Sequence, residues 1–366
     1  MRRAIPPGLL GVLIVAASLR AQAPPSPAAP PPAEVKAAFL RMLDRSRVPL
    51  DVRAAGPKEV APGIVSEKVE FATERHQDGT IERVPALVVR PSGARPGARL
   101  PAVIVLHGTG GRKEGEWNWL EPLARRGFVA IAIDGRYHGE RAGVVVGTKA
   151  YTDAIIRAWR SKPGEPQAHP LYYDTCWDIW RTLDYLQSRA DVDPDRIGMV
   201  GTSKGGIETW LAAAVDDRVK AAVPAIAVQG FRWGLDHDRY QARANTVRAA
   251  HEAAAADLDA AKVDREVCLA LWGKVLPGIT DRFDCPSMLR LFAGRSLLIL
   301  NGELDPNCPI EGAEVAIAAA RSAFHEAGGD DRLQVMIARG VGHTVTPEQH
   351  EAALGWLVAR LRPSPD

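Results

Sequence analysis

The chain has 366 residues, of which 46% are hydrophobic and 25% are charged. This ordinary globular composition excludes a disordered chain, a collagen-like chain and a protein with many membrane spans. The length suggests about two domains, or one large α/β domain with insertions. The net charge of +2 is too small for the basic surface that nucleic-acid binding requires, so we expect no nucleic-acid partner.

The first 33 residues have the pattern of an export signal followed by a linker. Two arginines precede an apolar run at 8–19, which is shorter than the about 20 residues that a membrane span needs. An Ala-x-Ala site follows and ends at Ala23. We therefore expect a signal peptide over 1–23, a Pro/Ala linker over 24–33 and a folded domain over 34–366. The protein would be secreted or periplasmic, with no membrane contact beyond the export signal.

Periodicity and turn residues predict the elements of the folded domain in chain order. The strands expected at 65–73 and 81–90 are joined by a turn at Asp78-Gly79, a dipeptide typical of hairpins. The expected helices are 34–47, 117–126, 174–189, 207–215, 315–326 and 347–361, and the expected strands are 65–73, 81–90, 101–106, 128–133, 196–200, 219–228, 297–300 and 333–338.

Strands that alternate with helices indicate an α/β fold, with a mostly parallel sheet and helices on both faces. The gap between the strands at 219–228 and 297–300 is unusually long, and its Ala-rich composition favours helices. We interpret residues 231–293 as an inserted helical cap.

A nucleophile elbow is indicated by Gly201-Thr202-Ser203-Lys204-Gly205, which lies between a predicted strand and a predicted helix. A sharp turn at this place lifts the Ser203 hydroxyl above the sheet edge, and the small residues Gly201 and Gly205 let the backbone close without a clash. A serine hydroxyl is a weak nucleophile until a base removes its proton, so a histidine and an orienting acid should follow in the chain.

The acid and the base are expected in loops that follow the last two predicted strands. Asp305 follows the strand at 297–300 and is the candidate that would orient an imidazole, with Glu303 as its rival. His343 lies in a Gly-flanked loop after the strand at 333–338 and is the candidate base. Its rival His350 falls inside the final predicted helix.

A second hydrogen-bond donor for a reaction intermediate is expected in the loop His107-Gly108-Thr109-Gly110-Gly111, which follows the strand at 101–106. We expect the oxyanion to lie between the backbone N–H groups of Thr109 and Lys204, with Gly110 as the alternative to Thr109. His107 itself is interpreted as structural.

The segments HGTGG, GTSKGG, NGELDPN and GVGHTVTPE together resemble the α/β-hydrolase superfamily over roughly residues 65–362. The nearest resemblance is to the dienelactone hydrolase, acetyl xylan esterase and prolyl-oligopeptidase-like group. The resemblance implies an α/β-hydrolase catalytic domain with serine esterase activity and no cofactor. The candidate nucleophile is a serine, whereas dienelactone hydrolases proper use a cysteine, so the same lactone chemistry is not implied.

Three tryptophans, Trp117, Trp119 and Trp233, lie near the expected site, and we expect some of them to form an aromatic wall for an acyl group or a sugar ring; the alternative is that they are ordinary core residues. No metal is expected, because no His or acid cluster has a recognisable ligand spacing. Of the four cysteines, Cys268 and Cys285 could form a disulfide inside the cap, or all could be free buried thiols.

The sequence therefore predicts an exported serine hydrolase that cleaves small-molecule or oligosaccharide esters through Ser203, His343 and Asp305. Acetylated or aromatic-ester fragments of plant polysaccharides are the expected substrates. Two alternatives remain: a serine peptidase or amidase that uses the same triad, and a non-catalytic binding protein with this fold.

Overall fold

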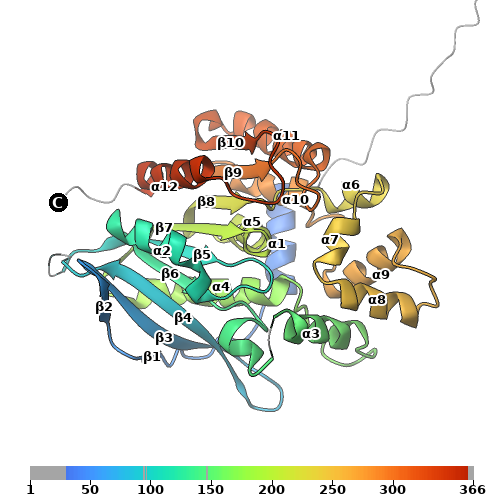
Figure 1. Ribbon diagram of the computed structural model, residues 1–366, viewed down its shortest axis with the longest axis horizontal. Helices are drawn as coiled ribbons and strands as arrows, with labels where there is room; N and C mark the ends of the chain where they lie inside the picture. The colour runs from blue at the N-terminus through green and yellow to red at the C-terminus, as the bar shows by residue number, and fades with distance from the viewer. Residues whose placement is uncertain (1–29, 94, 96, 146, 362–366) are drawn as a thin grey trace, which may run out of the picture.

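The computed structural model describes residues 30–361, except residues 94, 96 and 146 (Figure 1). The expected signal peptide and residues 24–29 of the expected linker lie outside the described residues. The last two linker residues belong to the first helix, α1 (Pro32–Met42), which begins two residues earlier than predicted and ends five residues earlier. Proline is compatible with this start, because the first helical N–H has no acceptor within the helix. Within the described residues, no helix combines the length and apolarity needed to cross a bilayer.

One sheet carries all ten strands that the described residues form, in the order β1-β3-β4-β6-β5-β7-β8-β9-β10, with β2 paired to β3. From β6 to β10 in this order, all strand pairs are parallel. The remaining pairs are antiparallel: β1 and β2 with β3, β3 with β4, and β4 with β6. The strands are β1 (Arg53–Ala54), β2 (Lys58–Ala61), β3 (Ile64–Arg75), β4 (Ile81–Pro91), β5 (Leu100–Leu106), β6 (Val129–Ile133), β7 (Val192–Thr202), β8 (Val219–Ala225), β9 (Ser296–Gly302) and β10 (Leu333–Ala338).

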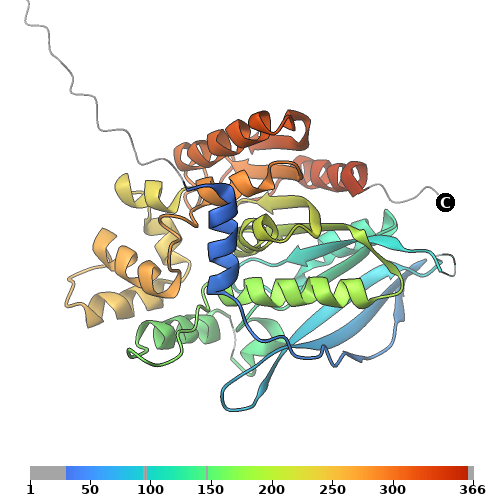
Figure 2. The ribbon, with the colours of Figure 1, turned by 180° about the vertical axis from the view of Figure 1, so that it is seen from behind.

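Helices cover both faces of this sheet, as Figures 1 and 2 show from opposite sides. Alternate residues of β5 serve the two faces: Ile104 packs in the core beneath α1, α4 and α5, whereas Val103 and Val105 pack beneath α2 and α12. The helices outside the segment 231–293 are α2 (Trp117–Arg125), α3 (Lys149–Trp159), α4 (Tyr173–Ser188), α5 (Lys204–Val215), α11 (Ile310–Glu326) and α12 (Pro347–Leu361). The predicted α/β fold is therefore confirmed.

The segment 231–293, between β8 and β9, is helical, and we call it the helical insertion. Much of it projects beyond the sheet next to α3 (Figure 1). Asp284 joins its two ends, because this carboxylate accepts hydrogen bonds from the backbone N–H groups of Phe231, Arg232 and Cys285, at 2.7–2.9 Å. Its elements are α6 (Phe231–Asp236), α7 (Gln241–Asn245), α8 (Arg248–Asp257), α9 (Arg265–Val275), α10 (Cys285–Leu289) and a short 3-10 helix (Arg290–Phe292).

The structure contains elements that the sequence did not predict, among them the short strands β1 and β2. Helix α3 was not predicted; it packs against α8 and α9 of the helical insertion. Of the two alternatives left open for the cysteines, the structure has the second: Cys268 and Cys285 are not joined, and all four cysteines are free and buried. Both Cys268 and Cys285 pack as apolar side chains in the larger of the two hydrophobic cores, which is a common role for a free thiol.

Candidate functional site

Ser203 lies in a strained turn between β7 and α5. Its φ of +57° is in the left-handed region, which a residue with a Cβ adopts only at a cost of about 1–3 kcal/mol. The flanking glycines are required by contact: a Cβ on Gly201 would lie 2.2 Å from the Gly205 oxygen, and a Cβ on Gly205 would lie 2.2 Å from the Leu106 oxygen. The chain can therefore make this turn, and pack it against the end of β5, only with glycine at both positions.

A continuous chain of hydrogen bonds joins Ser203, His343 and Asp305. The Ser203 hydroxyl lies 2.8 Å from His343 Nε2, and His343 Nδ1 lies 2.7 Å from Asp305 Oδ2. The Asp305 side chain is completely buried, whereas His343 is 25% exposed. An imidazole held in this way by a carboxylate can remove the proton of a serine hydroxyl and later return it to a leaving group.

The two rival residues lie elsewhere. The Glu303 carboxylate accepts a hydrogen bond of 2.7 Å from the backbone N–H of Gly340 and so supports the loop that carries His343. His350 lies on α12, where its Nε2 is 3.0 Å from the Asn118 oxygen and its ring is 4.2 Å from that of Trp119. The structure thus brings Asp305 and His343, and not their rivals, to Ser203.

The loop at 107–111 lies against the elbow. A Cβ on Gly108 would be 3.7 Å from the Ser203 Cβ, which places this backbone beside the serine. Thr109 follows it and is half-buried. Lys204 is the first residue of α5, where a backbone N–H has no acceptor within the helix. Both expected donor residues thus lie at or next to the elbow.

His107 holds this loop through both ring nitrogens. Its Nδ1 lies 2.7 Å from the Gly108 oxygen, and its Nε2 lies 3.0 Å from the Gly135 nitrogen. A carbonyl only accepts and an amide N–H only donates, so His107 must be neutral with its proton on Nδ1. Burial, followed by the nearby Lys204 ammonium, lowers the pKa of His107 to about 3, which keeps the ring neutral. The structural interpretation of His107 agrees with these contacts.

The Lys204 side chain forms a buried ion pair that the sequence reasoning missed. Its Nζ lies 2.6 Å from Glu208 Oε1, and both side chains are only 1% exposed. The same ammonium packs against Gly135, where a Cβ would lie 2.7 Å away. The Lys204 side chain thus packs the elbow against the loop after β6. The Lys-to-Glu spacing of four on one helix was the available signal, although such pairs are usually on the surface.

The three tryptophans do not form one wall. Trp119 is 2% exposed and packs in the core beneath α2 and α12. Trp117 is half-buried, and its Nε1 donates to Glu121 at 2.8 Å. Trp233 is half-buried, stacks on His237 with ring centres 4.3 Å apart, and lies against Gly312 of α11. No ring contact joins any two of these three in the part of the chain that the structure describes.

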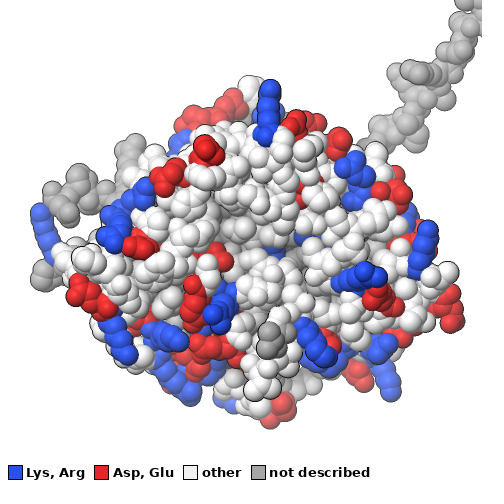
Figure 3. All heavy atoms as spheres, in the orientation of Figure 1, with Lys and Arg blue, Asp and Glu red and all other residues white. Residues whose placement is uncertain are grey.

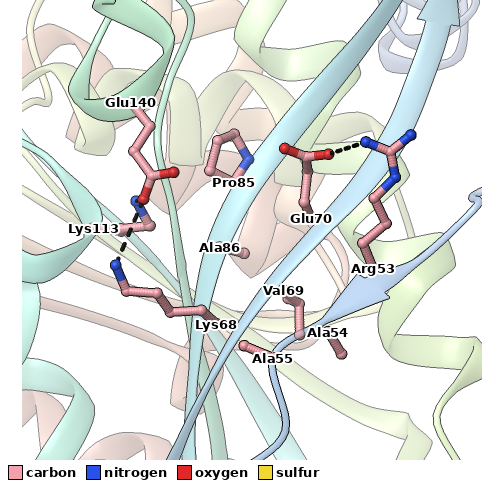
Figure 4. Close-up of a pocket in the computed structure, with 10 residues that line it drawn as sticks. All are labelled: Arg53, Ala54, Ala55, Lys68, Val69, Glu70, Pro85, Ala86, Lys113 and Glu140. Carbon is pink, nitrogen blue, oxygen red and sulfur yellow. Dashed lines mark hydrogen bonds and ion pairs between the residues drawn. The ribbon is translucent and has the colours of Figure 1, made fainter.

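A hollow is visible at the centre of the face in Figure 3, with lysine or arginine atoms at its floor. In the same orientation, Figure 1 places α5 and α7 around this position. A separate surface pocket of about 400 Å³ lies over β1, β3 and β4 (Figure 4). Its charged groups are already paired, Arg53 with Glu70 and Lys68 with Glu140, and none of its lining residues belongs to the Ser203 site.

No group of three or more His, Cys, Asp or Glu side chains suited to a metal ion occurs within residues 30–361, residues 94, 96 and 146 excepted. The hydrogen-bonded groups around Ser203 can support acyl transfer with protein groups alone.

Comparison with known proteins agrees with this architecture. Residues 84–261 match the Dienelactone hydrolase family. The chain is similar to YtaP of Bacillus subtilis (strain 168), with 32% identity over 155 residues, which cover 39% of this chain and 48% of YtaP. It spans about half the length of that relative.

Two solved structures have the same fold. An acetyl xylan esterase from Paenibacillus sp. R4 has a TM-score of 0.56 and 23% identity, over 90% of this chain and 93% of that one. A glucuronoyl esterase from Solibacter usitatus has a TM-score of 0.61 and 18% identity, over 90% and 91% of the two chains. The expected resemblance to the dienelactone hydrolase family is confirmed over residues 84–261, and the two esterase structures share the expected α/β-hydrolase fold.

Proposed function

We propose that this α/β-hydrolase is a serine esterase, in which Ser203, His343 and Asp305 act as nucleophile, base and orienting acid. The observation that carries the proposal is the unbroken hydrogen-bond chain Ser203–His343–Asp305 at a strained elbow. The family match and the likeness in fold to two esterases support ester hydrolysis as the reaction class. A fold alone does not determine a substrate, so the chemistry rests on the site.

The mechanism follows from the geometry. His343 Nε2 removes the Ser203 proton as the serine oxygen attacks the ester carbonyl, and Asp305 stabilises the imidazolium that forms. The carbonyl oxygen becomes negatively charged and binds the Thr109 and Lys204 amides. The imidazolium returns its proton to the departing alcohol, which leaves an acyl-enzyme on Ser203. A water molecule, activated by His343, then releases the acid and restores the serine.

The substrates that we propose are acetylated or aromatic-ester fragments of plant polysaccharides. Support comes from the similarity in fold to an acetyl xylan esterase and a glucuronoyl esterase, and from the N-terminal export pattern. We also propose that the protein is exported after removal of residues 1–23. N-terminal sequencing of the exported protein would support this with a start at Pro24 and contradict it with retention of Met1.

The proposed function is tested by turnover of a substrate panel. The panel contains short p-nitrophenyl esters, acetylated xylo-oligosaccharides, feruloyl esters and methyl glucuronate esters, with peptide anilides as amide substrates. We expect hydrolysis of the esters by the wild type and no hydrolysis by Ser203→Ala. Cleavage of anilides in preference to all esters would contradict an esterase in favour of a peptidase. No turnover of any member would favour a binding protein.

A further inference from the structure

Arg243, on α7 of the helical insertion, is a buried cation whose side chain contacts residues outside the insertion. Its side chain is 5% exposed. Its Nε donates to Gln229 Oε1 at 3.2 Å, beyond the end of β8, and its Nη2 donates to the Asn307 oxygen at 3.0 Å, in the loop after β9. The guanidinium also interacts electrostatically with the side chain of Tyr172, at the start of α4. One side chain thus joins the insertion to three segments of the core.

The charge of Arg243 is not neutralised in the usual way. Buried Arg136 forms ion pairs with Glu74 and Asp178, and buried Arg141 pairs with Glu82 and Asp178. Arg243 has no carboxylate within 4.0 Å among the described residues. Burying a guanidinium without such a partner is costly, so we expect Arg243 to have a role that offsets this cost.

Arg243 and Asp305 both hold the short loop at Asn307 and Cys308. Asp305 Oδ1 accepts from the backbone N–H groups of Asn307, at 2.8 Å, and Cys308, at 3.3 Å. Arg243 Nη2 binds the oxygen of Asn307 and the Sγ of Cys308, the latter at 3.4 Å. The loop is therefore held from the Asp305 side by its amides and from the insertion side by the guanidinium.

The contacts continue to the elbow. Cys308 Sγ lies 3.4 Å from the oxygen of Ile226, the residue after β8, and the oxygen of Ala225 accepts the Ser203 N–H at 2.9 Å. A shift of the loop after Asp305 would therefore change both the acid that holds His343 and the backbone next to Ser203.

We propose that Arg243 is a positioning residue through which the helical insertion aims the Asp305 carboxylate at His343, an inference that rests on the proposed esterase function. In this proposal the insertion contributes to the hydrolytic site through the contacts of Arg243 with the loop after Asp305. Because Arg243 acts on the base through Asp305, its loss should slow acylation of every ester by a similar factor and leave substrate affinity little changed.

The test compares wild type, Arg243→Met and Arg243→Lys on two esters with the same leaving group, p-nitrophenyl acetate and the mono-p-nitrophenyl ester of succinic acid, one neutral and one anionic. Arg243→Gln replaces the Met variant if that variant does not fold, as judged by circular dichroism. The matched control is Arg248→Met, which removes an arginine that is 72% exposed on the next helix of the insertion.

We expect Arg243→Met to lower kcat at least tenfold on both esters with little change in KM, and to slow fluorophosphonate labelling in proportion. Arg243→Lys should recover part of this loss, because it restores the charge but not the fork of donors, and Arg248→Met should match the wild type. An unchanged kcat, with or without lost thermal stability, would overturn the proposal. A rise in KM restricted to the anionic ester would overturn it in favour of a substrate contact. If the wild type hydrolyses neither ester and is not labelled by the fluorophosphonate, the esterase function itself is rejected.

Discussion

His251 links the stability of the helical insertion to pH. It lies on α8 with 1% exposure, and its Nε2 accepts a hydrogen bond of 3.0 Å from the Trp272 indole on α9. An indole N–H only donates, so this nitrogen cannot carry a proton while the contact exists. Burial lowers the pKa of His251 to about 4. Protonation would therefore break the contact and place a charge in the core.

The size of the effect follows from the difference between the folded and unfolded states. An unfolded histidine has a pKa of about 6.5, above the value in the folded protein. As pH falls below 6.5, the unfolded state binds a proton that the folded state does not, so stability is lost toward acid. Between pH 7 and pH 5 this amounts to about 2 kcal/mol. His251→Gln keeps an acceptor for Trp272 but does not titrate, so it should lose about 2 kcal/mol less than the wild type over the same interval.

Urea unfolding at pH 7 and pH 5, followed by circular dichroism, measures this difference. Other buried histidines contribute equally to both proteins and cancel in the comparison. His325→Gln is the control, because this residue is exposed on α11 and its neighbour Asp330 raises its pKa; the control should not show the smaller acid loss. Equal losses in the wild type and in His251→Gln would refute the reasoning.

Three further predictions concern packing. Gly205→Ala would place a Cβ 2.2 Å from the Leu106 oxygen and should abolish soluble folded protein. Gly355→Ala is the control, because its Cβ would meet nothing within 4 Å and should be tolerated. Equal expression of both variants would contradict the elbow geometry. Asp284→Ala should lower the free energy of unfolding by at least about 2 kcal/mol, because three backbone N–H groups lose their acceptor; an unchanged urea midpoint would disprove this. Trp119→Ala should cost about 3–5 kcal/mol and Trp117→Ala much less, and similar losses would reject the assignment of Trp119 to the core.

The sequence was sufficient to predict the fold and to select the residues that meet at Ser203, because each signal was local. Ser203 and Asp305 follow the buried ends of β7 and β9, and His343 follows β10, a half-buried edge strand parallel to β9. The carboxyl ends of parallel strands meet at one edge of the sheet. Their meeting is seen in the structure, whereas their catalytic roles remain a proposal.

The residues that were missed depend on contacts between distant segments. Arg243 meets Asn307 from 64 positions away in the chain, and nothing in the Ala-rich composition around it marks it as a core residue. The pattern could have corrected one expectation: Trp117 and Trp119 are two apart on a helix, and residues at that spacing face different directions. They could not both have lined one wall. By contrast, the spacing of Cys268 and Cys285 carried no information on whether the two cysteines would form a disulfide.

The most direct test of the central claim is intact-protein and peptide mass spectrometry after treatment with a fluorophosphonate. We expect one adduct, located on Ser203, with labelling lost in Ser203→Ala and strongly slowed in a folded His343→Ala variant. An adduct on another residue, or full labelling of Ser203→Ala, would contradict the assignment of Ser203 as the nucleophile.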